Sequence, residues 1–145
     1  NRTVANGIGN PDALQLLRDF DFNKNATLSS VLFAPFYLDK STGALTISDF
    51  NPASILKAPE GATHVSLEAA FIKLDFAGDK GEFQVSPIQN IPIHATSSNV
   101  VLQPTAVPTL SGTSFYLLKV SFFQLVNGIE YSLRNGNALT IVDVD

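Results

Sequence analysis

The sequence predicts an all-β fold, an antiparallel two-sheet β-sandwich of immunoglobulin-like or jelly-roll type, with one short N-terminal helix. Apolar and polar residues alternate with a period of two over most of the 145-residue chain, which is the pattern of half-buried strands. Turn residues recur about every ten positions and divide the chain into about eight to ten short strands, as is typical of sandwiches. A closed barrel is the alternative architecture.

The clearest strands lie within Phe115–Asp145. Asn127-Gly128 stands between two apolar runs, and this dipeptide favours the positive φ angles of a type I′ turn, so a two-residue hairpin is expected. The pairs that share the core face are then Val126 with Ile129, Gln124 with Tyr131, and Phe122 with Leu133. The same face continues upstream through Val120, Leu118 and Tyr116.

The last strand, Ala138–Val144, follows a second turn at Arg134–Asn137 whose length leaves two phases open. The core residues are Ala138, Thr140, Val142 and Val144 in one phase, and Leu139 and Ile141 in the other. Because the strand runs nearly to the chain end, with only two aspartates to discourage pairing, we expect it to form an exposed edge that a neighbouring molecule can share.

The N-terminal segment differs in character from the rest. Asn1–Gly9 is polar and interrupted by glycine, and it predicts an arm with Val4 and Ile8 as its apolar anchors. Asn10-Pro11-Asp12 then predicts the start of a short helix, with a capping Asn, Pro in the first helical position and a carboxylate at the positive end of the dipole. Since no linker or repeat divides the remainder, residues 10–145 are expected to form a single domain.

Several strands are expected between the helix and the middle of the chain. Phe20 and Phe22 alternate with polar residues in a first strand that ends at the turn Asn23-Lys24-Asn25. Further strands are expected at Thr27–Phe33 and Phe36–Leu38, which Pro35 separates, and at Ala44–Phe50. Asn51–Gly61 contains two prolines, which indicates a connection from one sheet to the other.

The apolar phase changes at Ala69–Phe71, after Val65 and Leu67, which predicts either a β-bulge or a strand long enough to serve both sheets. A partner strand is expected to begin at Phe83 and Val85. Ser86–Gly112 carries four prolines, so short edge strands fit it best.

The composition of the chain argues against several classes of function. Charged residues make up 15% of the chain and the net charge is −4, so no basic surface for nucleic acid is expected. No apolar run reaches the roughly 20 residues that a membrane-spanning helix needs. The chain has neither Cys nor Met and begins at Asn1, which indicates a processed product or a fragment, and we expect an extracellular or cell-surface location.

One run of oxygen-bearing side chains has the spacing of the first half of a calcium loop: Asp19, Asp21, Asn23 and Asn25. Lys24 stands where that loop needs Gly, and Ser30 stands where it needs the bidentate Glu. Polar residues facing outward from a half-buried strand explain the same pattern. We therefore expect no metal site in this run and keep it as a weak calcium candidate.

The sequence predicts no enzyme and no cofactor. His64 and His94 are the only histidines, and both are expected to be surface or hydrogen-bonded structural residues. A Gly-x-Ser-x-Gly nucleophile elbow is absent, and Gly78-Asp79-Lys80-Gly81 is too short for a phosphate-binding loop.

The short sequence segments that carry a resemblance to other proteins are Asp19–Asn23, Leu32–Phe36, Ala58–His64, Val126-Asn127-Gly128 with Tyr131 and Leu133, and Asn137–Asp145. Through these segments the chain resembles an uncharacterised family of proteins from Bacteroidetes-type bacteria over most of Phe20–Asp145. The resemblance implies a C-terminal β domain that follows an additional N-terminal segment in those proteins. It implies no activity.

These observations predict a structural, self-associating extracellular subunit, of a filament, surface layer or virion-like assembly, that forms a homo-oligomer or polymer by strand addition at its termini. The residues expected to carry self-association are Val4, Ile8, Leu139, Ile141, Val142 and Val144. The alternative is a carbohydrate-binding or adhesive module that holds a polysaccharide with the loops Asn51–Gly61 and Ser86–Gly112.

Overall fold

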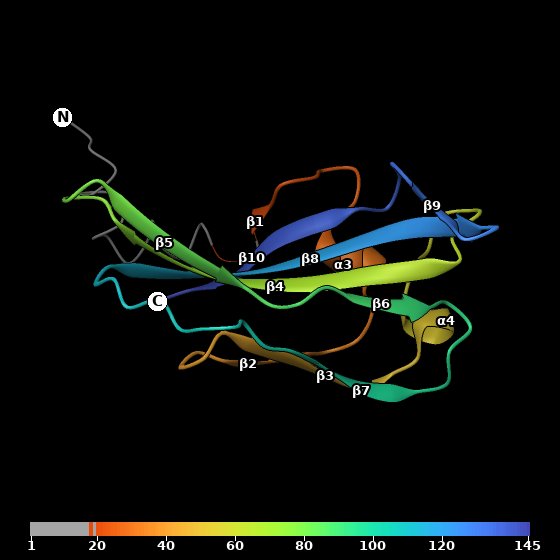
Figure 1. Ribbon diagram of the computed structural model, residues 1–145, viewed down its shortest axis with the longest axis horizontal. Helices are drawn as coiled ribbons and strands as arrows, with labels where there is room; N and C mark the ends of the chain where they lie inside the picture. Colours follow the sequence, from red (N-terminus) through yellow and green to blue (C-terminus); the bar gives the residue numbers. More distant parts are fainter. Residues whose placement is uncertain (1–17, 19) are drawn as a thin grey trace.

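Two antiparallel sheets packed face to face form the body of the protein (Figure 1). The structure is a computed structural model, and it describes Arg18 and residues 20–145. Its elements are β1 (Phe20–Asp21), α3 (Leu28–Val31), β2 (Tyr37–Asp39), β3 (Ala44–Phe50), α4 (Pro52–Ile55), β4 (His64–Asp75), β5 (Lys80–Val85), β6 (Gln89–Pro92), β7 (Ser98–Leu102), β8 (Thr113–Val126), β9 (Ile129–Ser132) and β10 (Ala138–Val144). The predicted all-β sandwich is confirmed, and the described strands form two sheets rather than one closed barrel.

Two long strands, β4 and β8, form the centre of the larger sheet. They pair without interruption from His64 opposite Phe123 to Leu74 opposite Thr113. The free side of β4 pairs first with β6 and then with β5, and the free side of β8 pairs with β10 and then with β9. β1 adds to the outer side of β10. The smaller sheet has the order β2-β3-β7.

The main core fills the space between the two sheets. Alternate residues of β4 meet their partners on β8, so that Val65 lies beside Phe122 and Leu67 beside Val120. The opposing sheet contributes Leu45, Ile47, Phe50, Val100 and Leu102, and all of these side chains are buried. Removing this much apolar surface from water is the main favourable contribution to folding.

A second, smaller cluster lies on the opposite face of the larger sheet. It consists of Phe115, Ile141 and Val144, with Ile72, Leu74, Phe76 and Leu117 packed against it. This cluster explains the change of apolar phase along β4. The strand continues in one register, and its last residues are apolar on the face turned away from the main core. A bulge in β4 is therefore wrong as an explanation.

The bulge of this region lies in β10 instead. Ala138 and Thr140 pair with Val120 and Leu118 on the main-core face, as the first of the two predicted phases requires. The register shifts between Ile141 and Asp143, and beyond this point Val144 pairs with Phe115 in the second cluster. The one extra residue moves Val144 to the opposite face, so neither phase holds over the whole strand.

The strand predicted at Thr27–Phe33 is wrong, because this segment contains the single helical turn α3. Leu28, Val31 and Leu32 are buried, and their spacing of three and four residues is that of a helix face. The Asp21 carboxylate accepts a hydrogen bond of 2.9 Å from the Leu28 N–H and so caps the turn from a distance in sequence.

The side chains of the first strand are also inverted relative to expectation. Phe20 and Phe22 are exposed and contact each other edge to face at 5.1 Å, while Asp21 and Asn23 turn inward and accept or donate hydrogen bonds. Polar residues point inward at this strand because they satisfy backbone groups of α3 and of the β9–β10 loop.

Other expectations agree with the structure. Ala44–Phe50 is a strand, and Asn51–Gly61 crosses between the sheets with one helical turn, α4, on the way. Ser86–Gly112 supplies β6 at the edge of one sheet and β7 at the edge of the other. The predicted arm Asn1–Gly9 and the helix start at Asn10 lie outside the described residues. Within residues 20–145, no helix is long and apolar enough to cross a membrane.

Asp143 anchors the end of β10. Its carboxylate accepts a hydrogen bond of 2.8 Å from Arg18 Nε and lies 3.2 Å from Lys40 Nζ in the β2–β3 loop. Burial alone would raise the pKa of Asp143, but the Val144 N–H, Lys40 and Arg18 together lower it below its usual value near 3.8. The charged form is therefore favoured in the folded state.

Replacing Asp143 with Asn should lower the free energy of unfolding by about 1–2 kcal/mol at pH 7, the range of charge-assisted hydrogen bonds at a partly exposed site. Because the folded pKa lies below the unfolded one, this contribution is present above about pH 4 and is lost as the pH falls through the folded value. Urea unfolding at pH 7 and pH 3 should show the two proteins converging at the lower pH. A difference that persists unchanged at pH 3 would show that the charge is not responsible.

Candidate functional site

The β8–β9 hairpin is the first candidate functional feature of the fold. Its register is the predicted one: Val126 pairs with Ile129 and Gln124 with Tyr131. Asn127 and Gly128 have φ angles of +52° and +79°, as a type I′ turn requires. The sequence therefore predicts this hairpin down to individual residue pairs.

The tip of the hairpin is apolar and exposed. Val126, Ile129 and Tyr131 lie on the face that forms the main core further along β8, yet they are 42%, 55% and 51% exposed. β8 has 14 residues whereas β3, the central strand of the opposing sheet, has seven. The hairpin thus extends past the sheet that would cover it, as Figure 1 shows on the right.

The outer edge of this hairpin has free backbone groups. Among the described strands β9 pairs only with β8. The Leu133 N–H donates to the Phe122 carbonyl oxygen at 3.0 Å, and this bond shows which residues of β9 direct their backbone groups toward β8. Ile129, Tyr131 and Leu133 direct their backbone groups toward β8, so those of Glu130 and Ser132 point outward. An unpaired, apolar strand edge is a template for pairing with another strand.

Asn137 closes the gap between β9 and β10 along the edge of β8. Its side-chain oxygen accepts from the Phe122 N–H at 3.3 Å, and its side-chain nitrogen donates to the Leu133 carbonyl oxygen at 2.9 Å. Its backbone oxygen accepts a further hydrogen bond from the Asn23 side chain. The amide group thus replaces one step of the β ladder and holds the end of β9 in place.

Replacing Asn137 with Ala should therefore cost about 1–3 kcal/mol of stability, because partly buried donor and acceptor groups of Phe122 and Leu133 lose their partner. Asn135→Ala, two residues earlier at an exposed position, is the matched control and should change stability by less than about 0.5 kcal/mol. Urea denaturation followed by circular dichroism measures both. Equal effects would show that the amide does not replace the ladder bonds.

A second open edge lies on β5. Phe83 is 68% exposed, and it shares a face with Ile72 of β4. Among the described strands β5 pairs only with β4, but the segment after β7 bonds to it at two places. The Thr105 N–H donates to the Val85 carbonyl oxygen at 3.2 Å, and the Glu82 carboxylate accepts hydrogen bonds of 3.1–3.3 Å from Thr109 and Leu110. The bond from Thr105 shows that the backbone groups of Val85, and by alternation those of Phe83, point away from β4.

Those residues assigned to self-association that the structure describes lie in β10 and not on these edges. Val4 and Ile8 lie outside the described residues. In β10, Ile141 and Val144 are buried, and Leu139 and Val142 are half-buried. β10 pairs with β8 on one side, and β1 pairs with it at Thr140 and Ile141 on the other. The prediction that Ala138–Val144 forms an open edge is wrong at Leu139–Ile141, because β1 and the Phe22 N–H cover the strand there.

The lengths of the strands are the signal that would have identified the exposed hairpin. The predicted strand ending at Val126 begins at Phe115, while the strand predicted at Ala44–Phe50, which the structure places in the opposing sheet, has only seven residues. Residues at the end of the longer strand then have no opposing layer. The open edge of β5, by contrast, depends on the strand order, which local sequence does not determine.

The described residues of the weak calcium candidate are Asp21, Asn23 and Asn25, and the first two bond to other groups of the protein. Asp21 accepts hydrogen bonds from the Leu28 N–H and the Thr140 hydroxyl, and Asn23 bonds to Asn25 and to the Asn137 backbone. Asp19 lies outside the described residues, and Asn25 is exposed. The described part of the chain contains no group of three His, Cys, Asp or Glu residues that could hold a metal ion.

The histidines have the structural surroundings expected of them. His64 stacks on Phe123 with ring centres 4.8 Å apart, and its Nδ1 lies 2.9 Å from the Thr63 hydroxyl. His94 is exposed.

Burial raises the pKa of Tyr116, whose hydroxyl donates to the Lys40 carbonyl oxygen at 2.7 Å and thereby ties the β2–β3 loop to β8.

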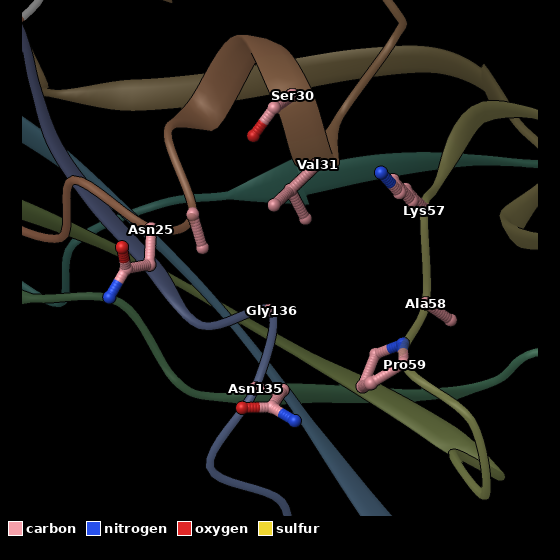
Figure 2. Close-up of a pocket in the computed structure, with 9 residues that line it drawn as sticks. Asn25, Ser30, Val31, Lys57, Ala58, Pro59, Asn135 and Gly136 are labelled. Carbon is pink, nitrogen blue, oxygen red and sulfur yellow. The ribbon is translucent and has the colours of Figure 1, made fainter.

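A small pocket of about 200 Å³ opens where α3, the α4–β4 connection and the β9–β10 loop meet. Figure 2 shows Ser30 and Val31 on one side, Lys57, Ala58 and Pro59 on another, and Asn135 with Gly136 below them. Gly136 has a φ of +81°, and a side chain there would press on Pro59 and on the Phe122 ring. The lining therefore combines one ammonium, two side-chain amides and a hydroxyl with apolar carbon surface.

Comparison with protein-family models, with curated proteins and with solved structures found no match. The resemblance to a Bacteroidetes-type family therefore stays a prediction.

Proposed function

We propose that the protein is a structural subunit that associates with copies of itself through the open edges of its larger sheet, in an extracellular filament, surface layer or virion-like assembly. One observation carries this proposal: two apolar edges of the larger sheet, β9 and the Phe83 part of β5, have no partner strand among residues 20–145, and they lie at opposite ends of the long axis of the molecule (Figure 1). A subunit with one such edge forms a dimer, whereas a subunit with two can form a chain.

The physical mechanism is the addition of one strand to another. Outward backbone groups lie at Glu130 and Ser132 on β9 and at Phe83 on β5. On association they exchange their hydrogen bonds to water for hydrogen bonds to a neighbouring strand. The exposed apolar side chains on the same strands then leave water together with them. Both edges are short, so we expect each contact to be weak and the assembly to depend on repetition.

Proline at outward positions tests this mechanism with little disturbance of the subunit itself. Ser132→Pro and Phe83→Pro each remove an N–H that points away from the sheet, so the ladder bonds to β8 and β4 remain. In sedimentation velocity we expect the wild type to form large species as its concentration rises. Each single variant should form smaller species than the wild type, and the double variant should remain monomeric.

Ser132→Ala is the matched control, because it changes the same side chain but keeps the N–H, and it should associate like the wild type. Circular dichroism must show the same β signal for all variants. A wild type that stays monomeric at every accessible concentration contradicts the proposal, as does a double variant that associates like the wild type.

The second proposed function is carbohydrate binding in the pocket of Figure 2. Amide, hydroxyl and ammonium groups of Asn25, Ser30, Lys57 and Asn135 surround apolar carbon from Val31 and Pro59, a combination that suits a hydroxylated ring. Only Lys57 and its neighbours come from a loop that the sequence assigned to this role. Titration calorimetry with neutral and acidic polysaccharide fragments, on the wild type and on Lys57→Ala with Asn135→Ala, tests it. Equal heats for both proteins would contradict it.

A further inference from the structure

We infer that the β9 edge pairs with the β9 edge of a second copy, antiparallel about a two-fold axis at Ser132, so that Glu130 of each copy lies opposite Arg134 of the other. The inference rests on the proposed function and gives its β9 contact a partner and a register. It follows from the backbone alternation of β9, the charges along this strand and the geometry of antiparallel pairs.

The alternation restricts which residues can face each other. In an antiparallel pair, hydrogen-bonded partners both direct their backbone groups at one another. On the open side of β9 these are Glu130 and Ser132. β9 ends at Ser132 and the chain bends from Arg134 onward, but the Leu133 carbonyl oxygen accepts from the Asn137 side chain on the β8 side. Because the carbonyl and N–H of one planar trans peptide group point in opposite directions, the Arg134 N–H also points outward. Under a two-fold axis, three registers pair Glu130 with one of these residues, namely with Glu130, Ser132 or Arg134 of the second copy.

Charge distinguishes the three registers. Glu130 opposite Glu130 places two carboxylates side by side, which is destabilising. Glu130 opposite Ser132 leaves both charged groups without a direct partner and places Tyr131 against Tyr131. Glu130 opposite Arg134 forms the opposite-charge pair twice, once on each side of the axis, and brings Tyr131 against Leu133.

The subunit itself leaves both charges available. Glu130 and Arg134 are exposed, and neither forms an ion pair or side-chain hydrogen bond with another residue in the described part of the chain. They lie at either end of the outward-facing stretch of the edge, and only four positions separate them. A second copy of the chain therefore supplies, by symmetry, the partner that each of them lacks.

Charge reversal in the Phe83→Pro background isolates the β9 contact, because the β5 edge is blocked there. Sedimentation equilibrium should give a monomer–dimer equilibrium for this parent protein. Glu130→Arg and Arg134→Glu should each weaken the dimer about tenfold, because each creates two like-charge pairs, and the double variant should recover to within about threefold of the parent. The single effects should shrink in about 1 M salt.

Cysteine cross-linking identifies the register independently, because the chain contains no Cys of its own. A short bismaleimide should link Ser132→Cys efficiently and Tyr131→Cys much less. Preferential linking of Tyr131→Cys, or a double charge variant that shows no recovery, would overturn the inferred register while leaving self-association intact. A parent protein that forms no dimer at all, together with a wild type that forms no larger species, would instead overturn the proposed function, and the inference with it.

Discussion

Replacing Gly43 with Ala is expected to destabilise the fold by about 2–5 kcal/mol. Gly43 ends the β2–β3 loop with a φ of +78°, a region that costs a residue with a Cβ about 1–2 kcal/mol. A Cβ there would also lie 2.7–2.8 Å from Cδ2 and Cβ of Phe71. Because Phe71 is buried against Tyr116, with ring centres 4.7 Å apart, the ring cannot move away cheaply, and overpacking adds about 1–3 kcal/mol.

Gly128→Ala is the matched control for this prediction. Gly128 has nearly the same φ, +79°, but nothing lies within 4 Å of the position that a Cβ would take. Only the cost of the positive φ angle then applies, so we expect the free energy of unfolding to fall by about 1 kcal/mol. Thermal and urea unfolding at low protein concentration measure both variants. Equal losses would show that the loop does not pack closely on Phe71.

Replacing Phe122 with Ala should cost about 3–5 kcal/mol, which is a large part of the stability of a domain this size. Phe122 is 2% exposed, lies opposite Val65 in the central strand pair and supports the β9–β10 loop at Gly136. Truncation would leave a cavity between the two sheets, and rigid strands on both sides limit how far it can close.

Tyr131→Ala is the contrasting variant on the same face of the same hairpin. Tyr131 is half-exposed beyond the reach of the smaller sheet, so its loss should change stability by less than about 1 kcal/mol but weaken self-association. Urea unfolding and sedimentation velocity on both variants separate the two roles. If Tyr131→Ala destabilised the subunit as much as Phe122→Ala, the hairpin tip would belong to the core and not to an interface.

The elements best predicted from the sequence are those whose neighbouring residues determine the local structure by themselves. Asn127-Gly128 allows only a tight hairpin turn, and this turn fixes every pair along β8 and β9. The alternation in Ala44–Phe50 likewise gives the buried positions Leu45 and Ile47. These features depend on neighbours in sequence, so they could be predicted from the sequence alone.

Errors occurred where distant segments decide the structure. The strand expected at Thr27–Phe33 is the helical turn α3, because Asp21 caps it and its apolar residues complete the main core. The face of Val144 changes because β10 is bulged next to a second cluster that no local pattern reveals. The open edge expected on β10 is covered by β1, and the edges that remain open follow from strand order.

Hydrogen–deuterium exchange of the backbone at low and high protein concentration tests the central claim most directly. The outward N–H groups of Glu130, Ser132 and Phe83 should exchange rapidly in the dilute monomer and become protected as the protein associates, while Tyr131 is protected at both concentrations. If the protein associates and these three N–H groups stay unprotected, its copies meet through some other surface, and association through the open edges of the larger sheet is contradicted.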